Sequence, residues 1–198
     1  MQISDLSEDD PDALEQAAQV LLAAFRGTTP AWPELPAARA EVRECLREGG
    51  LCRVARDGEG RVLGWVGGIS TYDGRVWEVH PLAVDPAHQR RGVGRALLAD
   101  LEALAAARGG LTLLVGTDDE VARTSLGGAD PYPDLLGALA GIRDLGAHPY
   151  RFYQRCGFSL AGVIPDANGR GKPDILMAKR IPSPADATRP AGIPHRDV

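Results

Sequence analysis

The hydrophobic positions of this chain follow two periods, and the period changes repeatedly along its length. Apolar residues that alternate or run together predict strands at 2–6, 51–56, 61–70, 76–84, 111–116, 158–164 and 174–181. Apolar residues at helical spacing predict helices at 11–25 and 36–47, between Gly92 and Gly109, near 135–142 and at 150–156. Strands interleaved with helices in this order predict an α/β protein.

The length of 198 residues suits one domain with a substantial core, and we expect that domain over residues 1–181. From Pro182 onward the sequence is rich in proline and has no apolar period. A segment of this kind cannot bury enough apolar surface to order itself, so we expect a disordered or loosely packed tail at 182–198.

Composition and charge exclude several classes of function. The formal net charge of −5 does not favour nucleic acid or an anionic membrane as a partner, and it is compatible with a cationic substrate. No apolar run reaches the ~18 residues of a membrane span, and the N-terminus lacks the features of a signal peptide. Cys45, Cys52 and Cys156 are scattered, which argues against a metal site or a disulfide framework and favours the cytoplasm.

A strand, a glycine turn and a helix meet in the middle of the chain. The strand at 76–84 precedes the turn, and leucines at helical spacing follow it. Backbone N–H groups in the first turn of a helix have no intrahelical partner, and glycines let a phosphate approach them. A tight turn with solvated arginines is the alternative. The residues of this candidate anion site are Gln89, Arg90, Arg91, Gly92, Val93, Gly94 and Arg95.

The order Gln-x-x-Gly-x-Gly in this turn resembles the pyrophosphate loop of the GNAT superfamily of acetyl-CoA-dependent N-acetyltransferases. The stretch 152–158, Phe-Tyr-Gln-Arg-Cys-Gly-Phe, resembles a late element of the same superfamily. Four further stretches, at 77–82, 116–119, 148–153 and 165–175, resemble one subgroup, the aminoglycoside 6′-N-acetyltransferases. This match covers roughly residues 62–181, whereas the first sixty residues match only in layout. The resemblance implies the GNAT acyltransferase fold, with a mixed central sheet flanked by helices.

The resemblance also implies a reaction and a set of site residues. Acetyl would pass directly from acetyl-CoA to the 6′-amine of an aminoglycoside, with no metal and with resistance as the consequence. In this scheme Glu78 takes a proton from the amine, the backbone N–H of Leu82 stabilises the oxyanion, and Tyr153 is the general acid. The pantetheine arm would pair with Leu82, Ala83 and Val84, and the diphosphate with 89–95. The candidate acceptor residues are Trp32, Tyr72, Glu78, His80, Asp118 and Asp119.

Strand alternation predicts that Glu78, His80 and Leu82 share one face of the strand. Three of the candidates also have a structural alternative: an ion pair with Arg75 for Glu78, a hydrogen-bonded structural role for His80, and a core position for Tyr153. The acidic stretch 117–148 is expected to select polycations, with a merely solubilising role as the alternative.

Three wider questions stay open from the sequence. The acceptor of the same reaction is alternatively another small polyamine or a peptide amine. A module that binds acyl-CoA without catalysis is a further alternative, although such a module needs neither Glu78 nor Tyr153. The family resembled also implies a homodimer, for which Trp65, Leu160 and Val163 are the candidate contacts.

Overall fold

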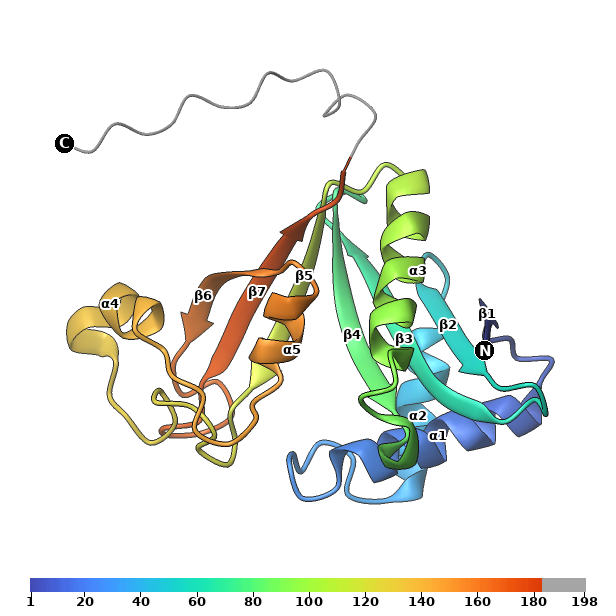
Figure 1. The fold of residues 1–198 in the computed structure, drawn as a ribbon, viewed down its shortest axis with the longest axis horizontal. Coiled ribbons are helices and arrows are strands. Elements are labelled where there is room, and N and C mark those ends of the chain that lie inside the picture. The colour runs from blue at the N-terminus through green and yellow to red at the C-terminus, as the bar shows by residue number, and fades with distance from the viewer. Residues whose placement is uncertain (183–198) are drawn as a thin grey trace.

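Seven strands form one mixed sheet in the computed structural model, which describes residues 1–182 (Figure 1). Their spatial order is β1-β2-β3-β4-β5-β7-β6. All neighbours are antiparallel except β4 and β5, which are parallel. The strands are β1 (Gln2–Asp5), β2 (Leu51–Arg56), β3 (Val62–Thr71), β4 (Val76–Val84), β5 (Thr112–Asp118), β6 (Ser159–Ile164) and β7 (Asp174–Arg180).

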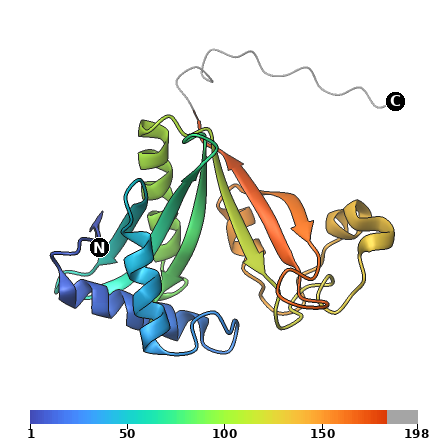
Figure 2. The same ribbon diagram turned by 180° about the vertical axis from the view of Figure 1, so that it is seen from behind.

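Helices cover the sheet on both faces (Figures 1 and 2). The face under α1 and α2 is called the α2 face, and the face under α3 and α5 is called the α3 face. The N-terminus of α1 is capped by the Asp10 carboxylate, which accepts a hydrogen bond of 3.0 Å from the N–H of Ala13. The helices are α1 (Pro11–Phe25), α2 (Leu35–Cys45), α3 (Val93–Ala107), α4 (Leu135–Ala140) and α5 (Tyr150–Arg155).

Every strand and helix that the hydrophobic pattern predicts is present, with ends that differ by a few residues. The mixed α/β fold is therefore confirmed. The predicted tail lies, apart from Pro182, outside the described residues, and the single domain over 1–181 stays a prediction. None of the helices described within residues 1–182 is long and apolar enough to cross a membrane.

Two apolar cores hold α1, α2, α3 and α5 to the sheet, and a third, smaller cluster holds α4. The core on the α3 face joins α3 and α5 to the central strands, and the core on the α2 face joins α1 and α2 to β2, β3 and β4. Trp65 belongs to the second core: it is fully buried, and its indole N–H donates to the carbonyl of Ala17 at 2.9 Å. Leu160 and Val163 pack beneath α4. The prediction that these three residues contact a second subunit is therefore wrong for Trp65, because its side chain has no exposed surface.

A bulge in β4 decides which side chains face the site. Val66 pairs with Leu82 and Gly68 with Val79, so one residue of β3, Gly67, lies opposite two residues of β4. A Cβ atom at Gly67 would lie 2.1 Å from the carbonyl oxygen of His80, so only glycine permits this close approach.

The bulge also reverses the alternation of side chains along β4. Trp77 and Val79 point into the core of the α3 face, as do Leu82 and Val84 after the bulge. The prediction that Leu82 shares a face with Glu78 and His80 is therefore wrong. Alternation fails here because the sequence pattern does not reveal the extra residue.

Candidate active site

The two central strands separate partway along their length, and this separation organises the site. β4 and β5 pair only at Val76–Glu78 and Thr112–Leu114. Beyond that point β4 continues to Val84 beside β3, while β5 continues to Asp118 beside β7, and the two diverge (Figures 1 and 2). Within residues 1–182, the backbone groups of 79–84 that point toward β5 therefore have no strand partner. Unpaired backbone of this kind is a template for an extended ligand.

The turn that follows β4 leads directly into the N-terminus of α3. Gly92 is the N-cap residue, with φ of +90° and no side chain capping the helix, which leaves the first N–H groups of α3 available. Arg90 has φ of +60°, and Arg90, Arg91 and Arg95 are exposed. Gln89 uses its side chain within the protein, donating to the carbonyl of Val84 at 3.1 Å. The turn therefore combines free N–H donors with positive charge, as an anion site requires.

The aromatic residues of α5 lie on the α3 face of the sheet. Tyr153 is 7% exposed, and its ring contacts those of Phe152 and Phe158 at centroid distances of 5.1 and 5.3 Å. A Cβ atom at Gly94 would meet the Phe152 ring at 3.3 Å, so α5 reaches the first turn of α3. Burial raises the pKa of Tyr153 above its ordinary range, which keeps its hydroxyl protonated. A protonated hydroxyl is what a general acid must offer.

Several acidic side chains meet on the α2 face, on the opposite side of the sheet from Tyr153. The carboxylate of Glu78 makes no hydrogen bond or ion pair with any other residue in 1–182, while Arg75 pairs with Asp73 at 3.6 Å. The alternative of an ion pair between Glu78 and Arg75 is therefore excluded. A carboxylate without a protein partner is available to an ammonium ligand.

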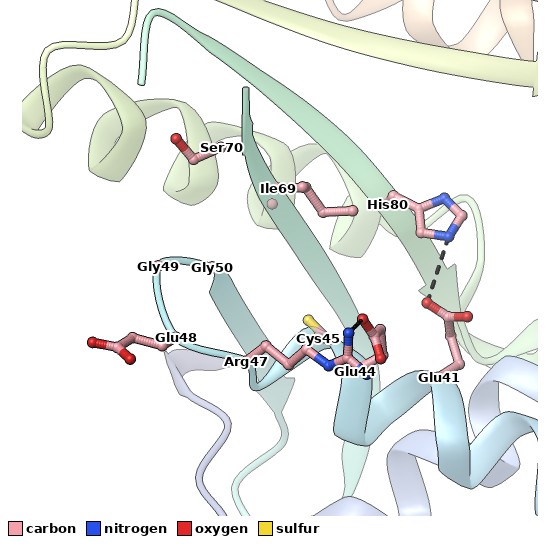
Figure 3. Close-up of a pocket in the computed structure, with 11 residues that line it drawn as sticks. Glu41, Glu44, Cys45, Arg47, Glu48, Gly49, Gly50, Ile69, Ser70 and His80 are labelled. Atoms are coloured by element: carbon pink, nitrogen blue, oxygen red, sulfur yellow. Dashed lines mark ion pairs between the residues drawn. The ribbon is translucent and has the colours of Figure 1, made fainter. Parts of the chain in front are cut away.

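His80 on β4 contacts side chains from two other parts of the chain, namely α2 and the segment between α1 and α2. Its Nε2 atom lies 3.5 Å from Oε1 of Glu41 on α2, and the indole N–H of Trp32 donates to Oε2 of Glu41 at 3.1 Å. Figure 3 shows the His80 and Glu41 side chains pointing toward each other at one end of a cavity of about 480 Å³. Glu41 thus brings together Trp32 and His80, two of the candidate acceptor residues, although the sequence did not mark Glu41 itself. No local signal marks Glu41, because its partners lie on other elements.

Asp118 faces a second carboxyl group that the sequence analysis also missed. Asp174 is the register partner of Asp118, and its carboxylate lies over Gly116, where a Cβ atom would be 2.6 Å away. Burial raises the pKa of Asp174 to about 6, and the charges of Asp118 and Glu78 add to the effect. Asn168 donates to Asp118 at 2.5 Å. The three carboxyl groups therefore define an electronegative surface, the acidic face, at 78, 118 and 174.

Asp119 and Tyr72 lie apart from this cluster. Asp119 is 1% exposed, and its carboxylate accepts hydrogen bonds of 2.6–2.8 Å from Arg123 and Thr124. The structure therefore corrects its predicted role: Asp119 closes the loop after β5, because the next residues fold back over it. Tyr72 is 76% exposed in the turn between β3 and β4, and within residues 1–182 its side chain makes no hydrogen bond or ring contact with the cluster.

The segment 117–148 does not present a continuous acidic wall. Asp130, Asp134 and Asp144 each accept hydrogen bonds from nearby backbone N–H groups, which is the ordinary chemistry of turns and helix caps. Asp118 is the one acid of this segment that belongs to the acidic face. The structure therefore places Asp118 beside Glu78 and Asp174, and it places Asp130, Asp134 and Asp144 in turns and helix caps.

Comparison with known proteins agrees with this geometry. The sequence model of the acetyltransferase (GNAT) family matches residues 14–124. The crystal structure of an aminoglycoside 6′-N-acetyltransferase complexed with coenzyme A is 32% identical, with a TM-score of 0.84 over 100% of both chains. The enzyme of the same name from Enterococcus faecium is 32% identical, with a TM-score of 0.82 over 100% of both chains.

A third structure, aminoglycoside 6′-acetyltransferase type Ii, is 31% identical, with a TM-score of 0.69 over 93% of this chain and 100% of the other. No curated protein sequence matches this chain significantly. The fold and the family match together define an acetyltransferase. The chain belongs to the acetyltransferase (GNAT) family.

Proposed function

We propose that this protein transfers the acetyl group of acetyl-CoA to the 6′-amine of an aminoglycoside, and so confers resistance to that antibiotic. The proposal rests on one observation: β4 and β5 diverge beyond Glu78 and Leu114. The gap between them lies between the arginine-rich turn at 89–95 and the acidic face. Two solved aminoglycoside 6′-N-acetyltransferases that match the whole chain at 32% identity support this choice of acceptor.

Acetyl-CoA would lie along the free edge of β4. Its pantetheine arm would pair with the backbone at Leu82, Ala83 and Val84, as an added strand does. Its diphosphate would bind the N–H groups at the start of α3, where Gly92 leaves the approach open and Arg91 adds charge. The coenzyme A complex of a matching structure supports this co-substrate.

The aminoglycoside would bind on the α2 face. Glu78 and Asp118 would hold its ammonium groups there, and Trp32 and His80 would form a side wall. A polycation would gain encounter rate and orientation from these carboxylates, and it would lose both as salt screens them.

Transfer then requires one bond to form and one to break. The neutral 6′-amine attacks the thioester carbonyl carbon, and its surplus proton passes to Glu78, directly or through water. The N–H of Leu82 would stabilise the oxyanion of the tetrahedral intermediate. When that intermediate collapses, the C–S bond breaks and the CoA thiolate takes a proton from Tyr153. A thiolate needs little assistance, because thiol pKa values are near ~8.5.

Release of free thiol from acetyl-CoA tests the reaction. Two aminoglycosides that differ only in an amine or a hydroxyl at the 6′ position form the decisive pair. We expect rapid release with the amine and background release with the hydroxyl. Equal release with both would exclude the 6′ position as the site of transfer, and no release with either would exclude the activity.

Two further expectations remain proposals. A homodimer is expected from the family resembled, and light scattering that shows only ~21 kDa species would exclude it. The cytoplasm is the expected compartment, and fractionation of expressing cells would test it.

A further inference from the structure

Glu41 hydrogen-bonds to Trp32 and forms an ion pair with His80. Each of its two oxygens serves one partner: Oε2 accepts the indole N–H at 3.1 Å, and Oε1 lies 3.5 Å from Nε2 of His80. Its side chain is 19% exposed, whereas that of His80 is 45% exposed. Glu41 is therefore less exposed than the His80 side chain toward which it points (Figure 3).

We propose that Glu41 is a positioning residue of the acceptor site, which fixes Trp32 and His80 as one wall and neutralises that wall toward a cationic amine. The proposal rests on the function proposed above, since it assigns the wall to acceptor binding. Glu41 acts through its two partners, and neither the family match nor the related structures assign it a role.

The first part of the argument is mechanical. Trp32 lies in the segment 26–34, which joins α1 to α2. Within residues 1–182, two side-chain hydrogen bonds tie this segment to the rest of the protein. One runs from Thr28 to the carbonyl of Phe25 at the end of α1, and the other runs from Trp32 to Glu41. The Trp32 ring also contacts Phe25 at 4.9 Å and His80 at 6.2 Å. Without Glu41, the Trp32 ring would keep these ring contacts and its packing against the core of the α2 face, but no hydrogen bond would fix its orientation.

The second part concerns charge. His80 is influenced by Glu41 from α2, by Glu78 from its own strand and by Asp118 from β5. Glu41 contributes most and raises the pKa of His80, against the opposing effect of burial. His80 in turn lowers the pKa of Glu41, and the Trp32 bond lowers it further. Of the other charges that line the adjoining cavity, Glu44 is paired with Arg47, and Glu48 lies at the far end.

These charges predict a definite effect of removing Glu41. With Glu41 present, the pair is neutral when His80 is protonated and negative when His80 is neutral. With glutamine in its place, the pair carries one negative charge fewer in either state of His80: it is positive when His80 is protonated and neutral when His80 is neutral. A polycationic acceptor would then be bound less tightly, whereas acetyl-CoA, whose proposed site along the free edge of β4 and the turn at 89–95 does not include this pair, would not be affected.

Glu41→Gln is the informative variant because its amide oxygen still accepts from Trp32. We expect an NMR titration of the histidine ring protons to show a lower midpoint for His80 and an unchanged one for His88, which pairs with Asp85. We expect the KM of the acceptor to rise about tenfold, the effect of one charge contact worth about 1.4 kcal/mol. The kcat and the KM of acetyl-CoA should stay within about twofold.

Glu15→Gln is the matched control. Glu15 makes a bidentate ion pair with Arg39 that ties α1 to α2, and neither residue contacts His80. This control should leave both the His80 midpoint and the acceptor KM unchanged, and an equal rise in KM would mean that any loosening of α2 suffices, which overturns the proposal.

The outcomes separate this proposal from the proposed function. An unchanged His80 midpoint in Glu41→Gln contradicts the positioning role, whatever the substrate is, because the titration needs no acceptor. Failure of the parent protein to acetylate any aminoglycoside contradicts the proposed function alone. If the parent acetylates another amine, the same comparison of KM is made with that amine, and an unchanged value again overturns the role of Glu41.

Discussion

Replacement of Gly67 by alanine tests whether the bulge in β4 builds the site. The new Cβ atom would lie 2.1 Å from the carbonyl oxygen of His80 and 2.9 Å from Sγ of Cys45. The cysteine side chain can rotate away, but the His80 carbonyl belongs to the backbone of β4 and must move by about 1 Å to reach the shortest contact that real Cβ atoms show. The displacement would pass to His80 and to the N–H of Leu82, two residues further along.

The expected magnitudes follow from this overlap. Overpacking in a well-packed interior costs ~1–3 kcal/mol, and each kcal/mol lowers the Tm of a protein of this size by about 2–4 °C. We therefore expect Gly67→Ala to melt roughly 2–12 °C below the parent. A displacement of about 1 Å at the reacting groups costs on the order of 10²-fold in rate, so we expect kcat to fall by that factor in the folded variant.

Gly162→Ala is the matched control, because Gly162 also lies beside a register shift, in β6. A Cβ atom there would meet Leu176 at 3.6 Å, which is ordinary contact. Thermal melting and thiol release should leave this control close to the parent. If Gly67→Ala melts and turns over as the parent does, the bulge is not what places His80 and Leu82, and the account of the site is wrong.

Three other substitutions test separate parts of the site. Gly92→Ala should raise the KM of acetyl-CoA severalfold, while Gly109→Ala, at the other end of α3 with φ of +82° and equally open surroundings, should lose similar stability without that rise. Tyr153→Phe should lower kcat by about 10²-fold or somewhat less with acetyl-CoA affinity unchanged; an equal or larger loss in Tyr150→Phe would remove Tyr153 from the acid role. The raised pKa of Asp174, about 6, means that its carboxyl is neutral below that pH and charged above it. The acceptor KM should therefore fall as pH rises through 6, and a profile that keeps this inflection in Asp174→Asn would contradict the assignment.

The elements of the fold could be predicted from the sequence because each is encoded locally. The two glycines and the leucines at helical spacing mark the turn and α3 without reference to any other part of the chain. The motif 152–158 likewise predicts a short helix followed by a strand, and α5 and β6 are found there. Local patterns therefore sufficed wherever a residue's role depends on its neighbours in the chain.

The contacts of the site could not be predicted in the same way. The side of β4 on which Leu82 lies depends on a bulge opposite Gly67, and the bulge is visible only when β3 and β4 are paired. Glu41 and Asp174 acquire their partners from other elements, so no spacing along the chain marks them. Asp119 shows the converse: its motif matched, but the loop after β5 folds over its carboxylate and buries it.

The position of the acetyl group on the product tests the central claim most directly. The parent protein would be incubated with acetyl-CoA and an aminoglycoside that carries several amines, including one at the 6′ position, and the purified product would be assigned by NMR. The account predicts a single acetyl group on the 6′ nitrogen, in an amount equal to the CoA released. Acetyl on another amine, or release of CoA without an acetylated aminoglycoside, would contradict it.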